Sequence, residues 1–355
     1  MWRTHSCVPC RDSSRHLGGC NTAAGVEKVS TRHAKCVRHV ALLALTLLAL
    51  ALHAQAPPPP LKPETEASKA LIAKASKTAG KLWPQEVHFF CEAPKANAAN
   101  DPIIEPSKIF DNVYAIGRNG TVVYAITTSD GIILIDAGYA TDVEPVLLDG
   151  MKKLGLDPAK IKAILVTHGH ADHFGGSAYL QQHYGAQVYI SAADWNFMEN
   201  PPGARGGKGK GPGQALPKHD QTLVEGQAVT VGDEKVLPVA VPGHTPGAMG
   251  FLFEVKDRGK THMAALFGGT ILLPQNATPE VLKQYLTSIA HFKDEAKKHK
   301  VDVELQNHPL MDNFEARLAQ HKQRPNGANP FVVGQDGYAR FLDVITSCMN
   351  AQLAR

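Results

Sequence analysis

The segment His168-Gly169-His170-Ala171-Asp172-His173 is the most informative stretch of this chain, because it gathers metal-binding side chains into six consecutive residues. The run I-K-A-I-L-V-T at 161–167 precedes it, and its length and β-branched content predict a buried strand. Two histidines at positions i and i+2 can face one metal ion from a strand end, and the Asp-His pair can face a second ion nearby. This spacing predicts a zinc-dependent hydrolase.

Two more histidines stand at expected strand ends. The segment P-G-H-T-P-G at 242–247 follows an expected strand at 235–241, and His308 follows an expected strand at 301–305. Glycine and proline on both sides of His244 force a tight backbone path, which fixes where its imidazole lies. The alternative for both residues is an ordinary histidine in a turn.

Strand and helix patterns alternate along the chain. The expected strands are 113–117, 122–127, 132–136, 161–167, 186–190, 228–231, 235–241, 249–255, 263–267 and 301–305, and the expected helices are 142–154, 173–183, 278–299 and 336–353. Mixed sheets with helices on their outer faces predict an α/β (α+β) fold in which helix, sheet, sheet and helix are stacked as four layers.

These motifs together resemble the metallo-β-lactamase superfamily. The resemblance rests on the cluster at 168–173, the G-H-T-P-G motif at 243–247, the I-D-A-G turn at 135–138 and His308, and it covers roughly residues 105–325. It implies the four-layered αββα sandwich of that superfamily and two Zn²⁺ ions. By this resemblance the metal ligands are His168, His170 and His244 for the first zinc ion, and Asp172, His173 and His308 for the second. Asp136 is implied as a residue behind the ligands, not as a ligand.

Thr270, in the segment L-F-G-G-T at 266–270, bears on the branch of the superfamily. Most of its hydrolases, including thioesterase-like and lactonase-like members, have a metal-bridging Asp there. The third subclass of class B β-lactamases has a hydroxyl residue instead and uses the histidine of Asp-His as a ligand, so Thr270 with His173 resembles that subclass. One departure is that Ile271 and Leu272 follow, where serines that hold the drug's carboxylate are common.

The resemblance implies an exported zinc hydrolase that confers resistance to β-lactam antibiotics. A zinc-bound hydroxide would open the ring of a small-molecule β-lactam, and Asp172 would orient that hydroxide and move its proton. The alternatives are a hydrolase of lactones or thioesters with the same fold, an iron-dependent oxidoreductase with the same ligands, and a non-catalytic metal-binding scaffold.

Charge and hydropathy at the N-terminus predict export. The chain has 355 residues with 37 Lys/Arg and 33 Asp/Glu, of which seven and two lie in residues 1–56, so the remainder carries 30 basic and 31 acidic groups. This balance gives no electrostatic case for nucleic acid binding. The 13-residue segment at 40–52, which is apolar except for Thr46, follows basic residues and is too short to span a bilayer comfortably, so we expect a signal peptide and no stable membrane anchor.

We therefore expect a periplasmic or secreted protein with four segments. Residues 1–36 are an upstream or n-region segment, 37–56 the signal peptide, 57–104 an N-terminal arm that begins with prolines, and 105–355 the metal-binding domain with a C-terminal helix. The Gly-rich stretch at 201–213 contains Arg205, Lys208 and Lys210 and is expected to be a mobile loop. Its cations could attract an anionic substrate carboxylate, and the alternative is a solvated insertion without such a role. The oligomeric state is left open by the sequence.

Only two cysteines follow the expected cleavage site, Cys91 and Cys348. An even number of cysteines in an oxidising compartment permits a disulfide between the arm and the last helix. The alternative is two buried thiols.

Overall fold

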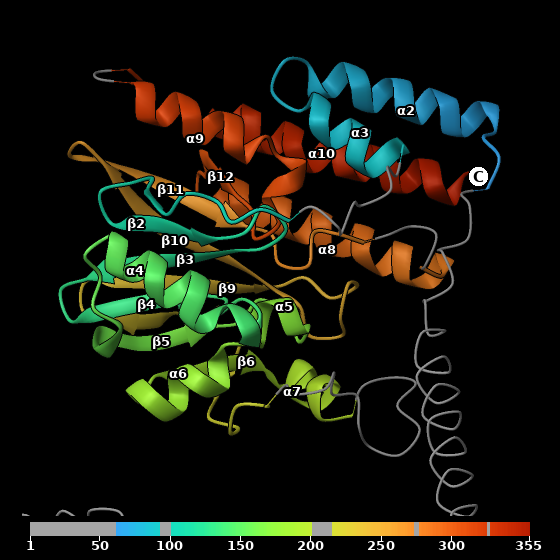
Figure 1. The fold of residues 1–355 in the computed structure, drawn as a ribbon. Coiled ribbons are helices and arrows are strands. Elements are labelled where there is room, and N and C mark those ends of the chain that lie inside the picture. The colour runs from blue at the N-terminus through green and yellow to red at the C-terminus, as the bar shows by residue number, and fades with distance from the viewer. Residues whose placement is uncertain (1–61, 93–100, 201–214, 273–276, 325–326) are drawn as a thin grey trace, which may run out of the picture. The chain divides into compact units, whose positions relative to one another are not determined.

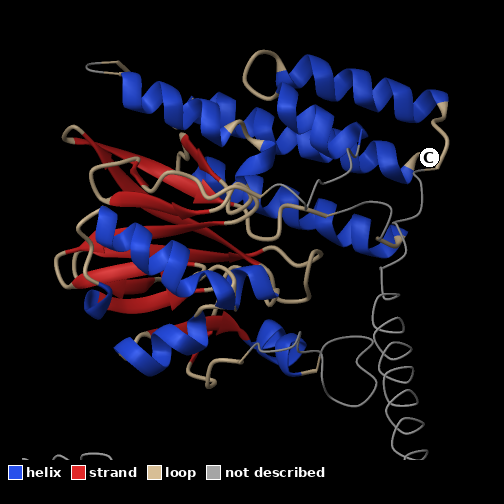
Figure 2. Ribbon diagram, viewed as in Figure 1, coloured by secondary structure: helices blue, strands red, loops and turns tan. Residues whose placement is uncertain are grey.

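In the computed structural model, two β-sheets pack face to face and helices cover both outer sides (Figures 1 and 2). The structure describes residues 62–92, 101–200, 215–272, 277–324 and 327–355. The expected upstream segment, signal peptide and Gly-rich loop lie outside these residues. Residues 58–355 form one compact structural unit.

The first sheet has seven strands in chain order. They are β1 (Ser107–Lys108), β2 (Val113–Gly117), β3 (Val122–Thr128), β4 (Gly131–Ile135), β5 (Ile161–Leu165), β6 (Gln187–Ser191) and β7 (Gln221–Leu223). β1 to β4 pair antiparallel, whereas β4 to β7 pair parallel. Parallel neighbours require crossover connections, and helices supply them here.

The second sheet has five strands, in the order β12-β11-β10-β9-β8. They are β8 (Val229–Val231), β9 (Glu234–Ala240), β10 (Met249–Asp257), β11 (Lys260–Leu266) and β12 (Val303–Leu305). β8 to β11 form an antiparallel meander, and β12 returns parallel to β11 after a long helix.

The helices lie outside the two sheets. They are α2 (Glu66–Ala79), α3 (Pro84–Glu92), α4 (Asp149–Lys153), α5 (Ala171–Phe174), α6 (Ser177–Tyr184), α7 (Ala192–Glu199), α8 (Pro279–Lys298), α9 (Phe314–Gln323) and α10 (Gly334–Leu353), with short helical turns η1 (Ala140–Asp142), η2 (Val143–Leu148), η3 (Pro158–Lys160) and η5 (Pro309–Met311). Within the described ranges, no helix has the length and apolar content needed to cross a membrane.

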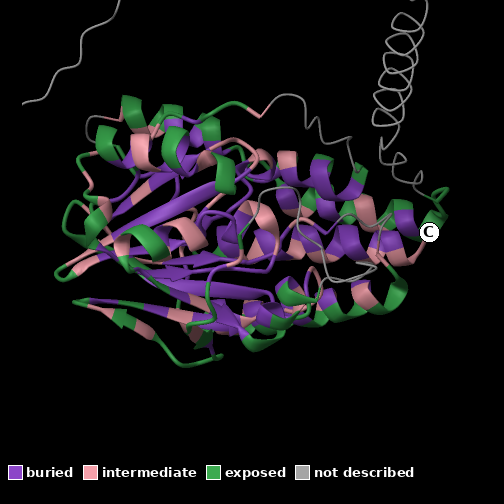
Figure 3. Ribbon diagram, turned by 60° about the horizontal axis from the view of Figure 1, so that its bottom comes forward, coloured by how far each residue is buried: buried purple, intermediate pink, exposed green. Residues whose placement is uncertain are grey.

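Three apolar clusters fill the spaces between these layers. Tyr124 and Phe251 belong to the cluster between the sheets, Phe292 and Phe341 to the cluster under α8 and α10, and Trp195 to the cluster that packs helices on the first sheet. Buried residues follow the strands through the centre, and exposed residues line the outer helices (Figure 3). The predicted four-layered αββα sandwich is thus confirmed.

The expected helix at 173–183 is wrong in its bounds. A short helix, α5, begins at Ala171, and α6 begins only at Ser177. Gly175 lies between them, where an added Cβ would be 2.4 Å from the carbonyl oxygen of Ala171 and 2.6 Å from the amide nitrogen of Ala140. The chain can pass this close to neighbouring backbone only with glycine there.

The N-terminal arm contains two helices, α2 and α3, which are not among the elements expected from the sequence. A capping box at Thr65 and Ser68 starts α2, and both α2 and α3 pack on α10. The Cys91–Cys348 disulfide joins α3 to α10, which confirms the bridge that the sequence permits. The arm therefore forms part of the helical layer over the second sheet.

A charged cluster is buried where α3 meets the end of β12 and α9. Glu86, Glu304 and Asp312 are at most 1 % exposed, and Arg317 pairs with Glu304 and stacks 4.6 Å from the ring of Trp83. Both carboxylate oxygens of Glu86 are without a hydrogen-bond partner in the structure. Burial and the nearby carboxylates of Glu304 and Asp312 raise the pKa of Glu86 well above its usual range, although Arg317 opposes the shift.

This buried carboxyl makes the stability of the fold depend on pH. Because the pKa of Glu86 is higher in the folded chain than in the unfolded chain, its contribution is most favourable below the unfolded pKa and is lost as pH rises toward the folded value. We expect Glu86→Gln to raise the free energy of unfolding by about 1–3 kcal/mol near pH 8 and to flatten its decline with pH. Urea unfolding from about pH 5 to pH 8 measures both effects.

The matched control is Glu92→Gln on the same helix, where the side chain is 59 % exposed and pairs with His88. This change should leave the pH dependence of stability as it is in the parent chain. Equal pH profiles for Glu86→Gln and the parent chain would show that Glu86 is not the group responsible.

Candidate metal centre

The topology brings strand ends from both sheets to one edge. In the first sheet β4 and β5 are parallel neighbours, so their carboxyl ends lie together. In the second sheet β9 and β11 both run antiparallel to β10, and β12 runs parallel to β11, so these three also end at one edge. The predicted site residues lie in the segments that follow these five strands, and two of them, Asp172 and His173, lie in α5 after β5.

Two backbone hydrogen bonds join the sheets at this edge. The amide of Met249 donates to the carbonyl of Thr167 at 2.8 Å, and the amide of Val122 donates to the carbonyl of Asn307 at 2.9 Å. The loops after β5 and β12 are thereby held across the gap between the sheets, which is why residues far apart in sequence meet there.

The first metal-binding group consists of His168, His170 and His244. The Nε2 atom of His244 lies 2.9 Å from Nδ1 of His170 and 3.0 Å from Nε2 of His168. Ligand nitrogens around a tetrahedral zinc ion, each at its usual bond length, lie about 3.3 Å apart. The three imidazoles are therefore arranged as an ion of this size requires.

The second group consists of Asp172, His173 and His308. Nδ1 of His173 lies 2.7 Å from a carboxylate oxygen of Asp136, and Nδ1 of His308 lies 2.6 Å from the carbonyl oxygen of Gly120. Since an N–H must donate to each of these acceptors, a neutral imidazole has its lone pair on the other nitrogen, Nε2. The Nε2 atoms of His173 and His308 lie 3.1 Å apart. A carboxylate oxygen of Asp172 lies 3.2 Å from Nε2 of His173.

These inward-facing acceptors need a positive charge between them. Without metal a proton supplies it: although burial lowers the pKa of His173, the carboxylates of Asp172 and Asp136 outweigh burial and raise it to about 10. Burial works against ionisation of Asp172 as well, but the His173 charge holds the pKa of Asp172 well below its usual range. A divalent cation would replace this proton and satisfy all three donor atoms.

The remaining histidines favour the neutral form that binds metal. Burial, together with neighbouring imidazoles, lowers the pKa of His168 and His244 well below the usual range, and burial lowers that of His170. Burial lowers the pKa of His308 to about 4. Five imidazoles and one carboxylate form a donor set that suits zinc.

Asp136 is linked by hydrogen bonds, directly or through Thr167, to one histidine of each metal-binding group. It follows β4 with a φ of 63°, a backbone conformation that is uncommon for residues other than glycine, and it is fully buried. Its carboxylate accepts from the amide of Thr167 at 2.8 Å and from the Thr167 hydroxyl at 3.0 Å. Nδ1 of His168 lies 3.1 Å from this hydroxyl, and His173 contacts Asp136 directly, so one carboxylate orients an imidazole in each group.

Thr270 is fully buried, and its hydroxyl forms hydrogen bonds with residues outside the two metal-binding groups. It lies 2.5 Å from the carbonyl oxygen of Phe267 and contacts the side-chain amide of Gln306. The Thr270 carbonyl in turn accepts from the hydroxyl of Tyr285 at 2.6 Å. These contacts fix the loop after β11 next to His244.

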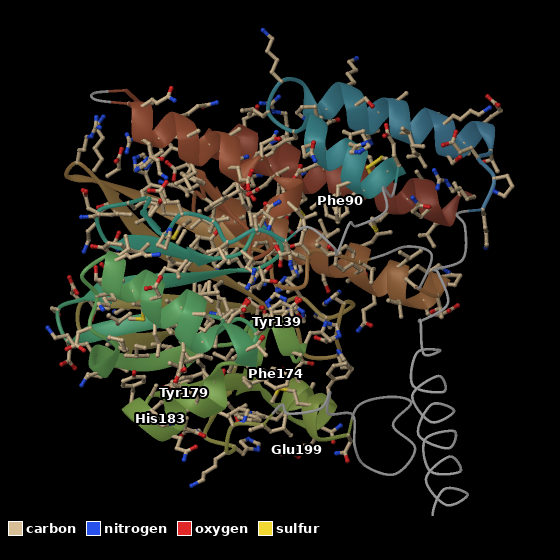
Figure 4. The ribbon with its side chains drawn as sticks, in the orientation of Figure 1. Phe90, Tyr139, Phe174, Tyr179, His183 and Glu199 are labelled. Carbon is tan, nitrogen blue, oxygen red and sulfur yellow. A yellow bond between two sulfur atoms is a disulfide. The ribbon has the colours of Figure 1, made fainter. Side chains whose placement is uncertain are left out.

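The sequence interpretation missed three residues around this centre. Asn307 donates to Asp136 and to the Thr167 hydroxyl at 3.0 Å, and buried Asp194 contacts the loops that carry the first group. Tyr139 follows the I-D-A-G turn and is 40 % exposed, and burial and the carboxylate of Asp172 raise its pKa to about 12 (Figure 4). Only Asn307 had a signal in the sequence, since it adjoins His308.

The comparison with solved structures decides the family. The subclass B3 metallo-β-lactamase BJP-1 of Bradyrhizobium japonicum is 30% identical, covers 70% of this chain and 91% of its own, and superposes with a TM-score of 0.57. The Metallo-beta-lactamase superfamily also matches residues 116–258. The chain belongs to the metallo-β-lactamase superfamily. A metallo-β-lactamase of Cronobacter sakazakii is similar as well, at 27% identity over 71% of this chain and 95% of its own, with a TM-score of 0.58. The chain is thus a hydrolase of this superfamily, and its fold is similar to that of the subclass B3 enzyme BJP-1.

Curated superfamily relatives match over shorter stretches. A probable metallo-hydrolase of Bacillus subtilis is 30% identical over 43% of this chain and 60% of its own length. A hydroxyacylglutathione hydrolase of Acidiphilium cryptum is 36% identical over 25% of this chain and 30% of its own. The chain thus spans 60% and 30% of the lengths of these two relatives, less than two thirds of each.

Proposed function

We propose that this chain is an exported zinc-dependent β-lactamase. Two Zn²⁺ ions would bind, one to His168, His170 and His244 and the other to Asp172, His173 and His308. The observation that carries the proposal is the convergence of the Nε2 atoms of His173 and His308, 3.1 Å apart, while the Nδ1 atom of each is committed to another acceptor. A divalent cation bound between them would accept the lone pairs of both Nε2 atoms and the carboxylate of Asp172.

The chain's own residues would then prepare the reaction. Zinc, when bound, supplies a Lewis acid and a bound water whose pKa falls to about 7. Asp172 is 22 % exposed, so its carboxylate faces both the metal ligands and the open side of the centre, where it can orient a water molecule and accept its proton. Thr121, whose hydroxyl lies 3.4 Å from the same carboxylate, helps to hold that orientation.

A cyclic amide fits this centre better than a thioester does. The subclass B3 neighbours are β-lactamases by name, and Thr270 stands where the resemblance places a bridging Asp in thioesterase-like and lactonase-like members. A metal-activated water needs no covalent nucleophile on the protein. A small-molecule β-lactam is therefore the proposed substrate, and resistance to such drugs is the proposed role.

A lactone or thioester hydrolase is the second candidate. The similarity to hydroxyacylglutathione hydrolase favours it, and so do Ile271 and Leu272 at positions where serines would help to hold a drug's carboxylate. For the β-lactamase, the missing serines could be replaced by a cation that binds the drug's carboxylate, and the Gly-rich stretch contains three candidates, Arg205, Lys208 and Lys210.

A substrate panel separates these two candidates. The chain from Pro57 onward, loaded with zinc, is tested on nitrocefin, a carbapenem, an acyl-homoserine lactone and a hydroxyacylglutathione thioester. We expect the largest kcat/KM on a β-lactam. A larger kcat/KM on the lactone or the thioester would replace the proposed substrate class by that one.

Export is proposed from the basic and apolar N-terminal segments, and the Cys91–Cys348 disulfide supports an oxidising compartment. A fusion of residues 37–56 to a reporter that is active only outside the cytoplasm tests it. We expect an active reporter, and an inactive one would contradict export through this segment.

Metal removal should abolish hydrolysis reversibly. The ligands lie on loops whose backbone is held by the two sheets, so the apo chain should stay folded while losing the groups that activate water. We expect dialysis against a strong chelator to remove activity and added Zn²⁺ to restore it. Recovery with Fe²⁺ but not with Zn²⁺, together with a redox activity, would favour the oxidoreductase alternative.

A further inference from the structure

Asp194 is a fully buried carboxylate outside the ligand set, in the first turn of α7. One of its oxygens accepts from the amide of Gly169 at 2.7 Å and from the hydroxyl of Thr245 at 2.6 Å. The other oxygen accepts from the amide of Gly247 at 2.8 Å. A single side chain thus contacts the loop after β5 and the loop after β9, which lie in different sheets.

These three donors directly flank the first metal-binding group. Gly169 lies between His168 and His170, and Thr245 is adjacent to His244. In the described residues, Asp194 is the carboxylate that bonds both loops, since the hydrogen bonds of Asp136 go to the loops after β5 and β12 and not to the loop after β9. The spacing between the β5 imidazoles and the β9 imidazole therefore depends on Asp194.

The packing of α7 confirms a close fit to these loops. An added Cβ at Gly247 would be 2.0 Å from the hydroxyl oxygen of Ser191, and one at Gly169 would be 2.9 Å from the side chain of Met198. The ring of Phe197 lies 5.5 Å from that of His170 in an edge-to-face arrangement. The helix is seated directly against the ligand loops, so a displaced Asp194 would displace the ligands.

We propose that Asp194 is the positioning residue of the first metal-binding group: it clamps the His168–His170 loop to the His244 loop and sets the affinity of that group for its metal ion. A carboxylate suits this task because each oxygen can only accept, and all three partners donate. In an Asn side chain, whichever way the amide turns, its NH₂ group would face an N–H or O–H donor.

This inference rests on the proposed metal site, but not on the proposed substrate, so it is tested by metal binding. His308→Ala disables the second group and leaves the three-histidine group, whose affinity for Zn²⁺ is measured by competition with a chromophoric chelator. His170→Ala is the reciprocal background, in which Asp172, His173 and His308 remain. Asp194→Asn is then introduced into each background.

We expect Asp194→Asn to weaken Zn²⁺ binding by about 10–100-fold in the His308→Ala background and to leave it unchanged in the His170→Ala background. Equal weakening in both backgrounds would mean a general loosening of the fold and would overturn the proposal, as would unchanged affinity in both. The matched control is Asp220→Asn, because this carboxylate also accepts from a backbone amide, that of Val188, and within the described residues its hydrogen bonds go to neither ligand loop.

A second pair of variants serves if Asp194→Asn does not fold. Thr245→Val removes only the hydroxyl bond to Asp194, whereas Thr245→Ser keeps it. In the His308→Ala background, Zn²⁺ affinity should fall with Val and be retained with Ser, and equal affinities for both would overturn the proposal. If the His308→Ala chain itself binds no Zn²⁺, the proposed metal site fails; if it binds Zn²⁺ but the parent chain hydrolyses no β-lactam, only the proposed substrate fails.

Discussion

We expect Asp172→Ala to lower kcat/KM on the preferred substrate by about 10²–10⁴-fold while the chain stays folded. The carboxylate is a donor of the second metal-binding group, 3.2 Å from Nε2 of His173, and it is the group best placed to orient a water molecule. It is part exposed and lies in a short helix behind a strand end, so its loss creates no cavity in the core. His170→Ala should have an effect of the same order, since it removes one of three first-group ligands.

Steady-state kinetics, zinc content and thermal unfolding of the two variants measure this prediction together. His183→Ala is the matched control, because this histidine stacks on Tyr179 on the surface of α6, away from the strand ends that carry the ligands (Figure 4). The control should keep parental turnover. If Asp172→Ala or His170→Ala kept near-parental turnover as well, the site assignment would be refuted.

The largest expected effect on stability comes from the disulfide. Cys91 and Cys348 are 257 residues apart in sequence, so the bridge removes much of the conformational freedom of the unfolded chain. We expect the Cys91→Ala/Cys348→Ala double variant to lose about 3–5 kcal/mol of the free energy of unfolding. Denaturant unfolding of this variant beside the oxidised parent measures the loss.

Activity supplies the control for that measurement. The bridge joins α3 to α10 in the helical layer, and neither helix carries a metal ligand. Below its unfolding transition the double variant should therefore keep its zinc content and turnover. A loss of less than about 1 kcal/mol would show that packing of α2 and α3 on α10 holds the arm without the bridge.

The candidate metal-binding residues could be predicted because their signals in the sequence are local. His168 to His173 occupy adjacent positions after an apolar strand, and the glycines and prolines around His244 mark a forced turn. The strands β2 to β5 were predictable for a related reason, since alternating or continuous apolar runs between turn residues report burial directly.

Elements held by tertiary contacts were not predictable. α2 contains two large apolar residues, Leu71 and Ile72, and both α2 and α3 are held by contacts with α10, to which the disulfide joins α3. α7 is only eight residues long, and its position depends on bonds from the loops after β5 and β9. Short segments like this have no period by which the sequence could identify them.

By itself the sequence determined which residues could bind metal, since the chemistry of imidazole and carboxylate groups and their spacing are written in adjacent positions. It also determined the layered fold, because the order of strands and helices allows few ways to bury their apolar faces. Only the tertiary structure decided which atoms face inward: Asp136, Gly120 and Thr167 fix the imidazole tautomers from behind. The same is true of Asp194, whose partners are distant in sequence and meet only because two sheets end at one edge.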